Sequence, residues 1–107
     1  MAAPRPVISV LRMFVIFGNY TAPLDEVDSH REAHLEFIAG LVASGNVVAS
    51  GRRAEGDGSA LVLSAGSREE VLALFDGDPY VLAGVVEYKL AAEFKPGAIA
   101  PGLESFS

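Results

Sequence analysis

Two side chains of this sequence, His34 and Asp78, are the candidates for a proton-transfer site. The imidazole of histidine exchanges protons near neutral pH, and a carboxylate is the usual group that orients the ring and stabilises its charged form. The chain has one further histidine, His30, and no cysteine, which excludes thiolate nucleophiles, disulfides and thiolate metal sites. If folding brings Asp78 to His34, the two residues form a minimal acid/base site.

Each member of this pair also has a purely structural interpretation. His34 falls on the apolar stripe of an expected helix, four residues before Ile38, so it can be a hydrogen-bonded core residue instead. Asp78 precedes Pro79, and this is the pattern of a helix N-cap followed by proline at the first helical position. A capping aspartate can also face a pocket, so the two roles are compatible.

Three other side chains are candidates for substrate binding: Ser50, Arg52 and Tyr80. Arg52 can anchor the carboxylate or phenolate of an acidic ligand, although a pair such as Arg52-Arg53 is commonly an ordinary surface feature. Tyr80 can line a pocket or pack in the core. Ser50 would need His34 as its base to act as a nucleophile, so a supporting role in binding is the better interpretation.

No metal or cofactor is expected. His30 and His34 have the spacing of helical metal ligands, but the sequence offers no obvious third ligand. The chain also lacks a glycine-rich phosphate loop, a nicotinamide fingerprint and a nucleophile elbow. The substrate itself would then carry the chemistry, which favours isomerisation or elimination over redox or phosphoryl transfer.

Length and charge restrict the remaining possibilities. The 107 residues are expected to form one domain, and half of them are apolar. The net charge of −6 and the scattered cations argue against nucleic-acid binding. The apolar segment 7–18 is interrupted by Arg12 and is too short to span a bilayer, so a buried strand is a better interpretation than a signal peptide or a membrane segment. Together with the absence of cysteine, this fits a cytoplasmic protein.

The apolar pattern divides the chain into short elements. Expected strands cover residues 9–18, 47–52, 60–65 and 85–94, and expected helices cover 25–44, 68–76 and 79–83. A turn is expected from Gly18 to Leu24, and an irregular tail at 97–107. The order β-α-β-β-α-β predicts a ferredoxin-like α+β fold with an antiparallel sheet, in a single domain over residues 1–107 with a core of about 9–96.

The expected last strand alternates between apolar and charged residues. Val86, Tyr88, Leu90 and Phe94 are predicted to face one way, and Glu87, Lys89 and Glu93 the other. Two helices cover one face of such a sheet, yet the strands carry enough apolar side chains for two buried faces. A second copy is the expected cover, which predicts a homodimer whose sheets pack face to face as a dimeric α+β barrel.

Several short stretches occur in a recognisable order. They are Met13-Phe14-Val15-Ile16-Phe17, Arg31-Glu32-Ala33-His34-Leu35, Gly45-Asn46-Val47-Val48-Ala49-Ser50-Gly51, Gly58-Ser59-Ala60-Leu61-Val62-Leu63, Asp78-Pro79-Tyr80-Val81-Leu82-Ala83-Gly84-Val85 and Glu93-Phe94-Lys95-Pro96. Over about residues 12–96, the chain thereby resembles the YCII-related family of the dimeric α+β barrel group. It departs from the family after the second strand, where Ser50-Gly51-Arg52-Arg53 replaces a common Gly-Pro, so the local loop is expected to differ.

The resemblance implies a function. In that family the helix histidine and the aspartate of the Asp-Pro motif are regarded as the active-site pair, which carries over to His34 and Asp78. Some relatives act on small ring compounds, including dechlorinating and isomerising steps, and many have no known reaction. The implied function is a cofactor-independent lyase or isomerase acting on a small, cyclic or carbonyl-bearing molecule. The alternative is a non-catalytic dimer that binds a metabolite or stabilises another enzyme.

Overall fold

The computed structural model describes residues 12–103. The elements are β1 (Arg12–Tyr20), α1 (Leu24–Asp28), α2 (Arg31–Ala43), β2 (Val47–Arg52), β3 (Gly58–Ala65), α3 (Arg68–Ala73), α4 (Pro79–Leu82) and β4 (Val86–Phe94). The strands form one antiparallel sheet in the order β2-β3-β1-β4, which confirms the ferredoxin-like α+β fold. Residues 9–11 of the expected first strand and 104–107 of the expected tail lie outside the described residues.

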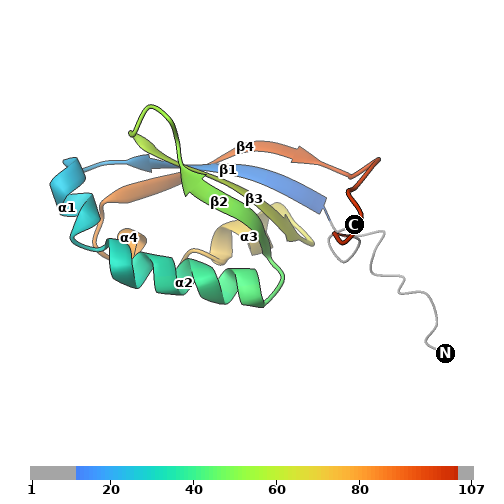
Figure 1. The fold of residues 1–107 in the computed structure, drawn as a ribbon, viewed down its shortest axis with the longest axis horizontal. Coiled ribbons are helices and arrows are strands. Elements are labelled where there is room, and N and C mark those ends of the chain that lie inside the picture. Colours follow the sequence, from blue (N-terminus) through green and yellow to red (C-terminus); the bar gives the residue numbers. More distant parts are fainter. Residues whose placement is uncertain (1–11, 104–107) are drawn as a thin grey trace.

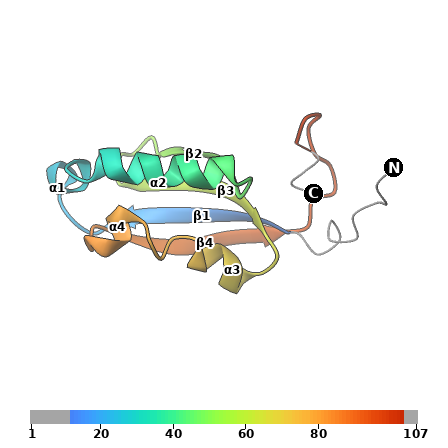
Figure 2. The ribbon, with the colours of Figure 1, turned by 90° about the horizontal axis from the view of Figure 1, so that it is seen from below.

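The helices α2, α3 and α4 lie on the same side of the sheet, as Figures 1 and 2 show from two directions. The core lies between them and the sheet. Phe14 and Ile16 of β1 stand opposite Leu63 and Leu61 of β3, and these four buried side chains pack with Ile38 of α2. Alternate strand residues point to one face, so the pleat of β1 and β3 places these four strand side chains under the helices. No helix within residues 12–103 has the length and apolar character needed to cross a bilayer.

The continuous helix predicted over residues 25–44 is wrong, because the chain forms two helices there. The break lies at Ser29 and His30. The Ser29 hydroxyl donates a 2.6 Å hydrogen bond to the carbonyl oxygen of Glu26, and the His30 N–H donates to Val27 only three residues back. Such bonds compete with the regular ladder and end a helix. As a result α2 begins at Arg31 and places His34 at the end of its first turn.

The turn predicted to begin at Gly18 starts later, because β1 continues through Tyr20. Gly18 stands between Ser59 of β3 and Tyr88 of β4 in the sheet register. A Cβ atom at position 18 would lie 2.7 Å from the Ser59 Oγ atom and 2.7 Å from the Tyr88 ring. Glycine within a strand commonly marks such a close approach, so this residue makes room for Tyr88 rather than for a turn.

A bulge reverses the alternation near the end of β4. The register against β1 shifts by one residue between Leu90 and Ala92, which leaves Ala91 without a partner in the ladder. One extra residue turns every following side chain to the opposite face. The alternation predicted up to Leu90 is therefore present, but the prediction for Phe94 and Glu93 is wrong. Phe94 lies on the open face and is 47% exposed, whereas Glu93 lies on the helix side and forms ion pairs with two arginines.

No helix within the described range covers the second face of the sheet: in Figure 1 α2 and α4 lie below the strands, and no helix lies above them. Val15 of β1 and Val62 of β3 stand opposite each other on this face and are half-buried. Phe17 is 38% exposed there, and Phe94 adds a second aromatic ring. The apolar surface that the strand composition predicted is thus present and lies opposite the helices.

Candidate active site

His34 of α2 and Asp78, the residue before α4, meet in the interior. The Nδ1 atom of His34 lies 2.8 Å from the Oδ1 atom of Asp78. His34 is 8% exposed and Asp78 is 0% exposed. The contact that the sequence predicted between these residues is therefore present. With Asp78 ionised, Nδ1–H donates to the carboxylate, which leaves Nε2 of the neutral ring as an acceptor.

The second ring nitrogen of His34, Nε2, has no hydrogen-bond partner within residues 12–103. In the same part of the chain, every fully buried side-chain nitrogen or oxygen does have a partner. Nε2 must therefore remain in contact with solvent. A general base has to reach the proton that it removes, and the arrangement leaves this nitrogen free to do so.

Asp78 is held by donors on both carboxylate oxygens. As the N-cap of α4, its Oδ1 atom accepts the backbone N–H of Tyr80 at 3.0 Å in addition to the histidine contact. The Tyr88 hydroxyl donates to Oδ2 at 2.5 Å. Burial and this hydrogen bond both raise the pKa of the Tyr88 phenol, so Tyr88 remains a protonated donor. These donors replace the water that the buried charge has lost, and the capping and site roles of Asp78 coexist.

Aromatic rings fix the orientation of the imidazole. The Tyr80 ring stacks on His34 with 3.8 Å between the ring centroids and 4° between the planes. Tyr20 packs edge-on against Tyr80, with 6.3 Å between the centroids. Burial raises the pKa of Tyr80, and Tyr20 adds to this effect. The phenol of Tyr80 therefore stays neutral, and its ring forms a flat wall beside the histidine.

Arg52, predicted to bind substrate, lies at the end of β2 and faces the site from the sheet. Its Nε atom donates to the Tyr20 hydroxyl at 3.0 Å, and its terminal nitrogen pairs with Asp28 at 2.5 Å. These hydrogen bonds to Tyr20 and Asp28 raise the pKa of Arg52 above its usual range. Its charge is thus compensated within the chain, and Arg52 supports the aromatic wall through Tyr20.

Arg53 points elsewhere, although it follows Arg52 directly. Its guanidinium donates to the Ser59 carbonyl oxygen at 2.7 Å and to the Asn19 side chain at 2.9 Å. It also lies over the ring of Phe17, on the open face of the sheet. Of the two adjacent arginines, only Arg52 therefore lies on the site's side, because successive strand residues alternate between faces.

The structure does not bring Ser50 to the pair. Ser50 lies exposed on β2, and its side chain forms no hydrogen bond with His34 or Asp78 in the part of the chain that the structure describes. His30, the N-cap of α2, also lies outside the dyad. Within residues 12–103 no group of three or more histidine, aspartate or glutamate residues is placed to hold a metal ion.

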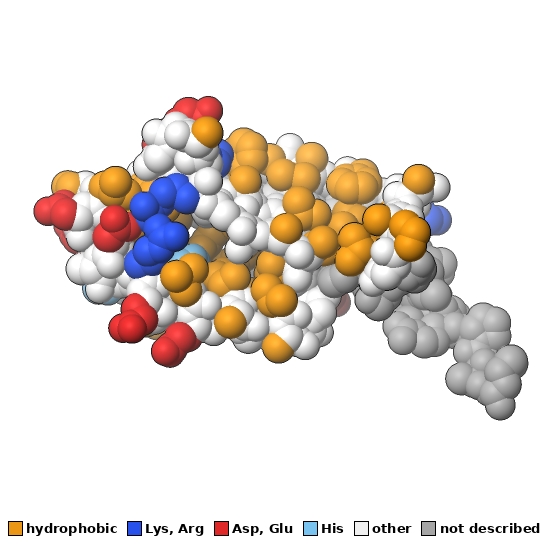
Figure 3. All heavy atoms as spheres, viewed as in Figure 1, with side chains coloured by type: hydrophobic (Ala, Val, Ile, Leu, Met, Phe, Trp, Pro, Cys, Tyr) orange, Lys and Arg blue, Asp and Glu red, His pale blue; other side chains and the backbone are white. Residues whose placement is uncertain are grey.

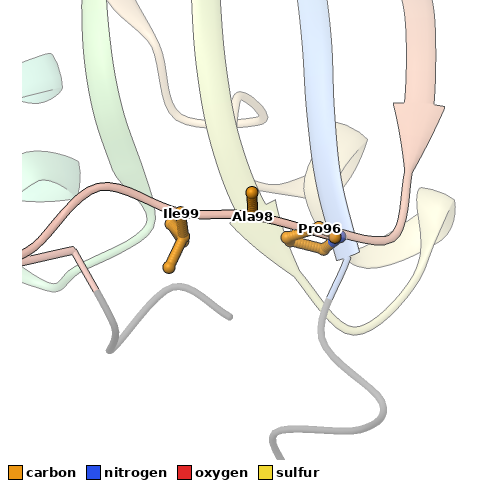
Figure 4. Close-up of a pocket in the computed structure, with 4 residues that line it drawn as sticks. Pro96, Ala98 and Ile99 are labelled. Carbon is orange, nitrogen blue, oxygen red and sulfur yellow. The ribbon is translucent and has the colours of Figure 1, made fainter.

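Two hollows in the described surface differ in volume and in the side chains that line them. A cavity of about 340 Å³ lies between α3, α4 and β4 and has Phe75 and Tyr88 among its lining residues, although His34 and Asp78 do not line it. Its volume is in the range of small-molecule sites. A second hollow of about 180 Å³ follows β4 and is lined by Pro96, Gly97, Ala98 and Ile99 (Figure 4). None of these four carries an acid or a base, so this hollow offers no chemistry.

Sequence reasoning missed the part played by Tyr88 and Tyr20. Both tyrosines are aromatic strand residues and fit ordinary core packing, and nothing local shows that their hydroxyls reach Asp78 and Arg52. The available signal was the alternation of β4, which places Tyr88 on the helix side. Gly18 in the neighbouring strand was the complementary signal.

The fold and the site together define a class: a small ferredoxin-like α+β domain with a buried His–Asp pair under its helices. Residues 13–95 match the YCII-related domain, so the chain belongs to the YCII-related family. No protein of curated function matches the chain significantly in sequence.

Solved structures share the fold. A 5-chloro-2-hydroxyhydroquinone dehydrochlorinase from Burkholderia phenoliruptrix, in complex with 2,5-dihydroxybenzoquinone, is 25% identical with a TM-score of 0.57, over 77% of this chain and 88% of that one. A protein of unknown function and possible oxidoreductase from Bacteroides thetaiotaomicron is 14% identical with a TM-score of 0.52, over 82% and 99% of the two chains. The second likeness shows the fold alone.

Proposed function

We propose that this protein is an enzyme that uses His34 as a general base and acid on a small ring compound, without a cofactor, in an isomerisation or an elimination. The observation that carries the proposal is the buried contact between His34 Nδ1 and Asp78 Oδ1, with Nε2 left accessible. A carboxylate in this position holds the tautomer in which Nε2 is basic, and it stabilises the imidazolium that forms.

The proposed elimination consists of removal of a proton, departure of the leaving group and release of the proton from the imidazolium. Nε2 takes a proton from a ring hydroxyl or carbon, and the electron pair of the broken bond forms a new double bond. The electron pair of the carbon–chlorine or carbon–oxygen bond leaves with chloride or hydroxide. The imidazolium then returns its proton to water or to the leaving hydroxide, so the net change is loss of HCl or water. An isomerisation uses the same first step and returns the proton to a different atom.

The likeness to the dehydrochlorinase supports this substrate class. That enzyme is 25% identical over most of both chains, and its structure holds a dihydroxylated quinone. In this chain the buried Tyr80 ring stacks on His34 and fixes the plane of the imidazole, so a planar ring would meet the accessible Nε2 edge of His34. We therefore place hydroxylated, quinone-like rings among the proposed ligands.

The test is binding and turnover by the purified full chain. We expect 2,5-dihydroxybenzoquinone to shift the NMR signals of the His34 ring in a saturable way. Chlorinated hydroxyhydroquinones are expected to release chloride faster with the protein than without it. Binding without any release would favour the alternative of a non-catalytic metabolite-binding protein. Absence of any effect on the His34 ring would refute the proposed site.

We also propose that the chain works as a homodimer whose open sheet faces pack together. The half-buried Val15 and Val62, with the exposed Phe17 and Phe94, form an apolar face that the helices leave uncovered. A second copy buries this face by symmetry, as a two-fold interface requires self-complementary surfaces.

A single charge on the open face tests the dimer. Val62→Asp is expected to shift the protein from dimer to monomer at micromolar concentration, because two carboxylates would otherwise be buried across the two-fold axis. Sedimentation velocity of the variant and of the natural chain measures the change. Leu82→Asp is the control, since Leu82 is 74% exposed on α4 at the helix side. A natural chain that sediments as a monomer would contradict the interface.

A further inference from the structure

Arg31 is a further cation beside the candidate site. It is the first residue of α2 and lies three residues before His34, so the two side chains share one helix face. Arg31 is half-buried, unlike the exposed Glu32 that follows it. A guanidinium in this position stands beside the candidate base rather than in open solvent.

No carboxylate among the described residues forms an ion pair with the side chain of Arg31. The nearby Arg52 donates hydrogen bonds to Asp28 and to the Tyr20 hydroxyl. Asp28, three residues before Arg31, is thereby already paired. Within residues 12–103, the side chain of Arg31 forms no hydrogen bond and no ion pair. A partly desolvated guanidinium with five unused donors is the most common recognition element for a carboxylate or an ionised hydroxyl.

The charge of Arg31 also acts on Tyr80 in the aromatic wall. The Arg31 and Arg52 cations act on the phenol of Tyr80 and oppose the effect of burial on its pKa. Tyr80 is the ring that stacks on His34, so the charge of Arg31 acts in the immediate surroundings of the candidate base. Figure 3 shows Lys and Arg side chains gathered beside a hollow on this side of the molecule, with a histidine side chain at its margin.

We infer that the site selects ring compounds that carry a negative charge, and that Arg31 is the specificity-determining residue that binds the anionic group. Arg52 is assigned a different part, as the support of the Tyr20–Tyr80 wall. The inference rests on the proposed function for the location of the ligand, and it adds the charge of the substrate class: a ring carboxylate or an ionised ring hydroxyl.

The test compares two probes of equal shape, 4-hydroxybenzoate and 4-hydroxybenzamide, titrated at neutral pH into the full chain with the His34 ring signals as the readout. We expect the acid to bind about tenfold to a hundredfold more tightly than the amide, as a charge-assisted hydrogen bond allows. In Arg31→Gln the two affinities are expected to become equal. Arg31→Lys is expected to keep part of the preference, because it keeps the charge but loses the planar fork.

Arg68→Gln provides the matched control. It removes the same charge from an exposed arginine that pairs with Glu93, and it should leave the preference unchanged. Equal affinity of the natural chain for acid and amide, or a preference that survives in Arg31→Gln, would overturn the inference. Failure of the acid to perturb His34 at millimolar concentration would overturn it as well. An Arg31-dependent preference without turnover of any ring compound would uphold charge selection and refute only the proposed catalysis.

Discussion

Replacing His34 with asparagine is expected to lower turnover of a ring substrate by about two to four orders of magnitude, which is the usual contribution of a general base. The asparagine amide can still donate to Asp78 from near the position of Nδ1, but it has no atom at the position of Nε2. The variant therefore removes the proton acceptor and keeps the internal contact. Initial rates of product or chloride release measure the effect, and circular dichroism checks that the fold is retained.

His30→Asn is the control for this experiment. It makes the same chemical change four residues earlier, at the N-cap of α2, where asparagine is well tolerated. Its rate should stay within a factor of about two of the natural chain, since exposed and rim substitutions have small effects. A His34→Asn variant that retains full turnover would show that His34 is a structural residue and would sink the proposed mechanism.

The second large effect concerns stability. Asp78→Ala is expected to lower the free energy of unfolding by about 2–5 kcal/mol. Loss of the cap contributes about 0.5–2 kcal/mol, and the orphaned donors of His34 and Tyr88 together add about 1–3 kcal/mol, because water entering the vacated space satisfies part of their hydrogen bonding. Urea unfolding at fixed protein concentration measures the change, because the apparent stability of the proposed dimer would depend on concentration.

Ser67→Ala separates capping from the buried network. Ser67 caps α3 by accepting the Glu70 N–H at 3.1 Å, and it has no link to the site. Its loss is expected to cost about 1 kcal/mol, as for an ordinary N-cap. The difference between the two variants then reports the contacts of Asp78 with His34 and Tyr88. Equal losses would show that Asp78 is only a cap.

The sequence by itself determined the order of helical and strand segments, although it predicted one helix where the chain forms α1 and α2. The pleat puts Phe14 and Ile16 on one face of β1, and Leu61 and Leu63 on one face of β3, but these continuous apolar runs did not show which face the helices cover. The Asp78-Pro79 cap was visible as well, because a cap depends on residues adjacent in the chain. The pairing of His34 with Asp78 was predicted partly from the family resemblance, which carries information about distant contacts that local pattern lacks.

Other features were decided only by the tertiary structure. The bulge at Ala91 depends on the register between β4 and β1, and no local pattern shows where a ladder slips. The helix break at Ser29 accompanies a hydrogen bond from the Ser29 hydroxyl to the Glu26 carbonyl oxygen. The composition of this stretch suits a continuous helix, so the break was not visible in the sequence. The Tyr88 hydrogen bond to Asp78 needs the Gly18 gap in a neighbouring strand.

The charge balance of the site was likewise invisible in the sequence. Arg31, Arg52 and Arg53 carry the same side chain, and the prediction that Arg52 binds substrate could not take their different ion pairing into account. Folding places Asp28 and Tyr20 around Arg52, turns Arg53 to the other face of the sheet, and leaves Arg31 without a partner among the described residues. Composition counts charges, but their compensation depends on distances of a few ångströms between residues far apart in the chain, and only the tertiary structure sets those distances.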